Sequence, residues 1–315
     1  MKKGNFLIVL LCIYSAKTFG QQVSDTLFSP GISNAAYSLN MGPVVAIDEG
    51  HNNFHTQSGR YVTLSKLLKQ DGYVVQKFEG SLEKNKLKDI DILIIANSLN
   101  SSNVNNWALP VPSAFSDAEI KTLNTWVKKG GRLLLIADHM PFPGAAQKLG
   151  ASFGIDFQNV FASDKRRREL DYFTRSDGSL VNSQLTEGLD SIVTFGGSAF
   201  SITGSTFTPI LVLDHNYALI YQDTARVFNK NTVIKPAAGW LQLACFSYGK
   251  GRIVVSGEAA MFSAQVVVQR NNWKMGFNNP GARNNVPLIQ NLFRWLGDGI
   301  KSTSSGLSSS FKKYN

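Results

Sequence analysis

The chain has 315 residues, of which 43% are hydrophobic and 17% charged, and a formal net charge of +10. Its two cysteines, Cys12 and Cys245, exclude a fold held by several disulfides, so its stability must come from a hydrophobic core. The positive charge is spread along the chain, apart from 165–168 and the C-terminal tail. It favours anionic glycans or envelope surfaces as partners, and no nucleic-acid partner is expected.

The N-terminus has the pattern of a secretory signal peptide. Lys2 and Lys3 precede an apolar run over 6–14, and small residues lie before Gln21 and Gln22. Nine apolar residues are too few to cross a bilayer, which takes about 20. We therefore predict a signal peptide over 1–21, a secreted or periplasmic protein and no transmembrane segment after cleavage. A short membrane anchor and lipidation at Cys12 are the alternatives.

A polar leader over 22–40 precedes alternating strand and helix patterns. Buried strands are predicted at 43–48, 73–78, 91–96 and 132–137, and helices at 58–70, from Ser116 and at 143–153. Ser116 and Glu119 form a capping box at the start of the second helix.

The pattern changes over 155–235, where short β-like runs predict an antiparallel insertion. A hairpin at 240–256, a closing helix at 286–296 and a disordered tail over 301–315 complete the chain. The βα alternation predicts one α/β domain over 41–300, with a doubly wound, mainly parallel, flavodoxin-like sheet. Ligands of such sheets bind at the carboxyl ends of the strands.

Polar side chains follow three of the predicted strands. They lie in 48–55, at 138–139 and at Glu258, on what should be one edge of the sheet. The candidate catalytic residues are His51, Asp138, His139 and Glu258. The candidate ligand-binding residues beside them are Asp48, Glu49, Asn52 and His55.

Three interpretations of this edge remain open. A divalent metal could bind through His51, His55 and His139, since a helical turn would place the first two on one face. A histidine paired with Asp138 or Glu258 could instead activate water without a metal. The third interpretation is that these groups only cap helices and order loops. No nucleophile is evident, since Cys245 lies in an apolar strand.

A Gly/Asn-rich loop over 275–285 is a second candidate site. It opens the closing helix, whose N-terminus favours anions. Arg283, Asn284 and Asn285 could bind a carboxylate, a sulfate or sugar hydroxyls there.

The segments 47–56, 130–139 and 285–296 resemble the DUF4350 group of the class I glutamine amidotransferase-like, flavodoxin-like superfamily. The resemblance implies that fold over 41–298. True amidotransferases place a cysteine at the elbow after a central strand, where this chain has Asp138-His139-Met140, so cysteine-dependent glutaminase activity is not expected.

Two functions follow as expectations. One is an envelope hydrolase that acts on a small polar or carbohydrate substrate. The other is a non-catalytic module that binds a glycan or an envelope partner.

Overall fold

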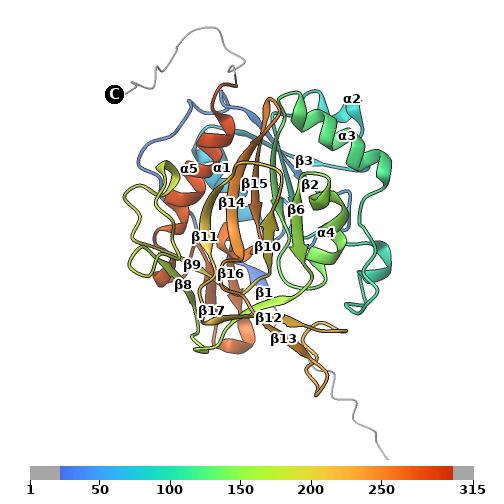
Figure 1. Ribbon diagram of the computed structural model, residues 1–315. Coiled ribbons are helices and arrows are strands. Elements are labelled where there is room, and N and C mark those ends of the chain that lie inside the picture. Colours follow the sequence, from blue (N-terminus) through green and yellow to red (C-terminus); the bar gives the residue numbers. More distant parts are fainter. Residues whose placement is uncertain (1–21, 301–315) are drawn as a thin grey trace, which may run out of the picture.

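The computed structural model describes residues 22–300, so the predicted signal peptide and tail lie outside the described residues (Figure 1). Its centre is a nine-stranded sheet in the order β3-β2-β4-β5-β15-β14-β10-β6, in which β11 also pairs with β14. One half is a parallel run: β3 (Val74–Phe78), β2 (Val44–Asp48), β4 (Ile92–Ala96), β5 (Arg132–Ile136) and β15 (Gly251–Ser256). The other half is antiparallel: β14 (Leu241–Tyr248), β10 (Ala199–Ile202), β6 (Ile155–Gln158) and β11 (Thr208–Val212).

Helices cover both faces of the parallel run (Figure 1). Along β2, Val45 and Ile47 pack in one hydrophobic cluster and Ala46 in the other, because successive side chains point to opposite faces. The first cluster includes buried residues of α1 (Val62–Gln70) and α5 (Asn285–Gly297). The second includes those of α2 (Lys84–Leu87), α3 (Asp117–Lys128) and α4 (Phe142–Ala151). Burial on both faces is why the central strands, such as β4, are continuous apolar runs in the sequence.

Three smaller antiparallel sheets complete the structure. Their orders are β1 (Gln22–Ser24)-β16 (Ala264–Val267)-β17 (Trp273–Gly276), β13 (Val233–Pro236)-β12 (Tyr217–Tyr221)-β7 (Phe161–Asp164) and β8 (Asp171–Thr174)-β9 (Ser191–Thr194). Short 3₁₀ turns lie at Ser101–Asn103, Gln184–Thr186, Ala260–Phe262, Val268–Arg270 and Pro280–Ala282. The predicted leader is thus part of the fold, because β1 pairs with β16.

The prediction of a doubly wound, mainly parallel, flavodoxin-like fold is wrong. Among the described residues, nine of the thirteen strand pairings are antiparallel. The segment expected as an insertion carries antiparallel strands, but β6, β10 and β11 extend the main sheet. The molecule is therefore a strand-rich assembly of mixed and antiparallel sheets. Short strands pair with distant partners, which a local pattern does not reveal.

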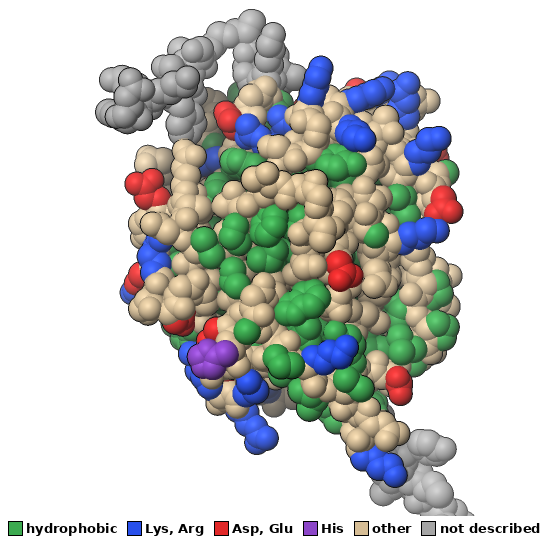
Figure 2. Space-filling view, in the orientation of Figure 1, with side chains coloured by type: hydrophobic (Ala, Val, Ile, Leu, Met, Phe, Trp, Pro, Cys, Tyr) green, Lys and Arg blue, Asp and Glu red, His purple; other side chains and the backbone are tan. Residues whose placement is uncertain are grey.

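Several local predictions are confirmed. Ser116 and Glu119 form the capping box of α3, and β14 and β15 form the predicted hairpin. Cys245 is a buried residue of β14. Figure 2 shows Lys and Arg side chains spread around the rim of one face rather than gathered in one patch. Within residues 22–300 we find no helix long and apolar enough to cross a membrane.

Candidate functional site

The polar strand ends share one edge of the main sheet, as predicted. The parallel order β2-β4-β5-β15 places Asp48, Asn97, Asp138 and Glu258 at or just past the carboxyl ends of successive strands. Asn97 was not predicted, although it directly follows the apolar run of β4. The contacts of each side chain decide whether this edge can perform chemistry.

His51 lies between two carboxylates. Its Nδ1 is 2.9 Å from Oδ2 of Asp48, and its Nε2 is 3.1 Å from Oε1 of Glu119 on α3. Asn53 donates a further hydrogen bond to the Asp48 carboxylate, and the ring of Phe115 packs 4.5 Å from that of His51. His51 therefore links β2 to α3, and both of its ring nitrogens are occupied.

The contacts of the His51 imidazole with the carboxylates of Asp48 and Glu119 shift the pKa values of His51 and Glu119. Burial disfavours the imidazolium, but the hydrogen bonds and charges of Asp48 and Glu119 outweigh burial and raise the pKa of His51. Burial likewise opposes ionisation of Glu119, yet hydrogen bonds from Ser116, His51 and Leu82 lower its pKa to about 2. A histidine whose two ring nitrogens both contact carboxylates, and whose pKa is raised by them, forms a bridge between those carboxylates and is a poor general base.

His55 points to a different neighbour. The Asn97 amide donates to its Nδ1 at 3.2 Å, and its ring packs 4.7 Å from that of Tyr61. Burial, followed by the charges of Arg60 and His139, lowers the pKa of His55 well below its usual value. The helical turn expected between His51 and His55 does not form, since Asn52 has a φ of +49°. The two imidazoles consequently have separate partners.

Asp138 and His139 are half-buried at the end of β5. The Asp138 carboxylate accepts the backbone N–H of His139, and Nδ1 of His139 donates to the carbonyl of Met140 at 2.8 Å. Nε2 of His139 then lies 3.3 Å from Nη2 of Arg226, which donates to it, and its ring stacks 4.4 Å from that of Phe161. Burial, with a contribution from Arg226, lowers the pKa of His139.

Glu258 is buried beyond β15 and orders the chain that follows. Its two carboxylate oxygens accept the backbone N–H groups of Ala260 and Met261 at 2.9 and 2.8 Å. Burial, followed by the charge of Asp138, raises the pKa of Glu258 well above its usual value. Asp138 and Glu258 therefore lie close enough to interact. Asp48 and Glu119, the two carboxylates that contact His51, form a separate cluster.

The structure does not bring the three metal candidates together. His51 contacts carboxylates, His55 an amide, and His139 a carbonyl and a guanidinium. Across residues 22–300, no three His, Cys, Asp or Glu side chains are arranged to hold a metal ion.

The other predicted ligand-binding residues also have intramolecular partners. Glu49 accepts the backbone N–H of Gln57, and Asn52 donates to the carbonyl of Leu99. At the start of α5, Arg283 forms an exposed ion pair with Asp190.

Asn284 and Asn285 connect α5 to the segment of β9. Asn284 donates to Asp190 and to the carbonyl of Ser191. Asn285 is fully buried and bonds both the N–H and the carbonyl of Val193. This loop therefore fastens α5 to β9.

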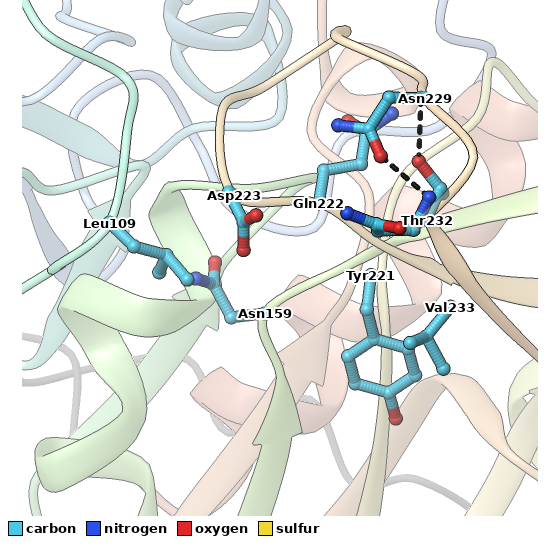
Figure 3. Close-up of a pocket in the computed structure, with 9 residues that line it drawn as sticks. Leu109, Asn159, Tyr221, Gln222, Asp223, Asn229, Thr232 and Val233 are labelled. Atoms are coloured by element: carbon cyan, nitrogen blue, oxygen red, sulfur yellow. Dashed lines mark hydrogen bonds between the residues drawn. The ribbon is translucent and has the colours of Figure 1, made fainter.

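A cavity of about 230 Å³ lies beside the connection between β12 and β13. Leu109 and Asn159 lie on one side, and Asn229, Thr232 and Val233 on the other (Figure 3). The lining is completed by Tyr221, Gln222, Asp223 and Asn231. None of the predicted site residues lines it, but Arg226, in the same hairpin connection, contacts His139. The connection carries no periodic pattern, so sequence reasoning missed this cavity.

Comparisons with known proteins find solved structures of similar fold but no matching family. No family model matches the chain, and no curated protein matches it by sequence. The mmIFT52 N-terminal domain superposes with a TM-score of 0.59 at 15% identity, over 82% of this chain and 99% of that one. A ThuA-like protein from Bacteroides uniformis gives a TM-score of 0.46 at 12% identity, over 85% of this chain and 95% of that one.

The first of these likenesses concerns the fold alone, given its low identity. The exo-β-1,4-mannosidase Op5Man5 from Opitutaceae bacterium strain TAV5 also matches, with a TM-score of 0.41 at 13% identity over 81% of this chain and 36% of the mannosidase. The predicted membership in the DUF4350 group and in the class I glutamine amidotransferase-like, flavodoxin-like superfamily is wrong. No family model matches the chain, its fold is instead similar to that of the mmIFT52 N-terminal domain, and most of its described strand pairings are antiparallel.

Proposed function

We propose that this protein is a non-catalytic glycan-binding module that works outside the cytoplasm. The proposal rests on one observation: predicted catalytic side chains already form hydrogen bonds or ion pairs with other groups of the protein. Both ring nitrogens of His51 face carboxylates, both oxygens of Glu258 accept backbone N–H groups, and Nε2 of His139 accepts from Arg226. A general base needs an available lone pair within reach of substrate, so these groups are poorly suited to hydrolysis.

The chemistry of the cavity supports a glycan as the ligand. Its lining combines the side-chain amides of Asn159, Gln222, Asn229 and Asn231 with apolar surface from Leu109 and Val233. Amides donate and accept hydrogen bonds to hydroxyl groups, while apolar side chains contact the C–H faces of a sugar ring. This combination suits a hydroxyl-rich ligand better than an aliphatic one.

The function can be tested with insoluble polysaccharides. Purified protein is incubated with peptidoglycan, chitin and mannan, and both the bound fraction and the released reducing ends are measured. We expect binding to at least one polysaccharide with no release of reducing ends, and the same binding by Asp138→Asn, which retains the acceptor for the His139 N–H. Reducing ends released by the wild type and lost in Asp138→Asn would indicate a hydrolase. Absence of binding to all of them would also overturn the proposal.

Export is a separate part of the proposal and rests on the N-terminal sequence. When the full chain is expressed in a Gram-negative host, we expect the mature protein in the periplasm or medium. N-terminal sequencing should begin near Gln21 or Gln22. An intact Met1 on soluble cytoplasmic protein would contradict export while leaving glycan binding open.

A further inference from the structure

We infer that the cavity beside the connection between β12 and β13 is the glycan-binding site, and that it takes a single uncharged sugar ring with Gln222 as its buried anchor. This inference rests on the proposed function and assigns it a place and a ligand class. The cavity is built from three separate parts of the chain: Leu109, Asn159 and the segment 221–233.

Gln222 has an unused donor. The side chain is only 6% exposed, and its Oε1 accepts the backbone N–H of Arg226 at 2.8 Å. This bond fixes the orientation of the amide, because exchanging the two amide atoms would set N–H against N–H. Nε2 is buried and has no hydrogen-bond partner among residues 22–300. A buried donor without an acceptor costs about 1–3 kcal/mol, and a ligand hydroxyl oxygen that reaches Nε2 would remove this cost.

The walls of the cavity are held in place without a ligand. Oδ1 of Asn229 accepts the backbone N–H of Asn231, and the backbone N–H of Asn229 donates to Oγ1 of Thr232 (Figure 3). Tyr221, which lies beside Val233 in Figure 3, is also held: its hydroxyl donates to Gln158 at 2.9 Å, and the Lys235 ammonium lies 4.8 Å from its ring centroid. A preformed site loses little conformational entropy when it binds.

Size and charge define the ligand class. At about 230 Å³ the cavity is smaller than the range of about 300–1,000 Å³ typical of drug-sized sites, so it accommodates one ring rather than a chain. Asp223 is the charged residue in its lining, which contains no Lys, Arg or His. A carboxylate repels anionic ligands, so an uncharged sugar is favoured over a uronic acid.

The experiment titrates D-glucose, D-galactose, D-mannose, N-acetyl-D-glucosamine and D-glucuronate into ¹⁵N-labelled protein. Binding is followed in every variant by the backbone amide resonances of residues 221–233, and in the wild type also by the side-chain amide resonance of Gln222, which is assigned by its loss in Gln222→Glu. That variant keeps an acceptor for the Arg226 N–H and removes the donor, so we expect it to weaken binding of the neutral sugar at least about tenfold. D-glucuronate should leave the Gln222 resonance unmoved.

Two further variants separate binding from folding, and thermal melting is recorded for all of them. Gln184→Glu makes the same chemical change at an exposed position outside the cavity and should bind like the wild type. Asn231→Ala removes an exposed lining amide and should weaken binding several-fold with an unchanged melting temperature. If neutral sugars bind equally well to the wild type, Gln222→Glu and Asn231→Ala, this site is wrong while glycan binding stands. If the wild type binds no sugar and no polysaccharide, both proposals fail.

Discussion

Replacing His51 with alanine is expected to lower the free energy of unfolding by about 3 kcal/mol, because it leaves two carboxylates facing a cavity without their cation. Asp48 is fully buried and Glu119 is 16% exposed, so water can compensate only one of them. The measurement is chemical denaturation of the wild type and His51→Ala, followed by circular dichroism.

The His51 effect should depend on pH in a defined direction. Its pKa is raised in the folded state above the unfolded value of 6.5, so the folded protein binds the proton more tightly. The stabilisation is therefore complete below the unfolded pKa and is lost as pH rises through the folded pKa. The difference between the wild type and His51→Ala should stay constant at pH values below 6.5 and shrink as the pH is raised above 6.5.

His215 provides the matched control. It is an exposed histidine in the turn before β12, and His215→Ala should change the free energy of unfolding by less than about 0.5 kcal/mol. A stable His51→Ala protein that has lost ligand binding would show that His51 belongs to a site after all.

Replacing Asn285 with alanine is expected to cost about 3 kcal/mol, since it leaves both the N–H and the carbonyl of Val193 buried without a partner. The same asparagine begins α5, so its loss also removes two hydrogen bonds between that helix and β9. Urea denaturation of the purified variant gives the change directly.

Asn284→Ala is the neighbouring control. Asn284 is only half-buried and its contacts are with Asp190 and Ser191, so we expect a loss of about 1 kcal/mol or less. Equal stability of the two variants, with loss of anion or sugar binding in Asn285→Ala, would instead support the ligand role suggested by the sequence.

Sequence reasoning located individual elements well and the architecture poorly. The strands β2, β4 and β5 are runs buried on both faces, and α3 begins at a capping box, so local chemistry marks them. Strands such as β7, β10 and β12 are only four or five residues long, and their partners lie far away in the chain. Their pairing depends on long-range packing, which is why the mainly parallel fold class was wrong.

The candidate site shows the same division. Parallel pairing made it predictable that Asp48, Asp138 and Glu258 share an edge. The partners of these groups were not predictable, because a rotamer or a left-handed residue such as Asn52 redirects a side chain without any periodic signal. Glu119 was recognised as a helix cap, yet its contact with His51 joins positions 68 residues apart.

The sequence by itself determined where the buried strands and helices lie and which polar residues end the parallel strands, because hydrophobic periodicity and capping are local properties. Only the tertiary structure decided that those polar residues bond to one another and to the backbone. It also decided that Leu109, Asn159 and Gln222 meet around a cavity. The physical reason is that a cavity forms where separate segments pack incompletely, and no stretch of sequence specifies its neighbours alone.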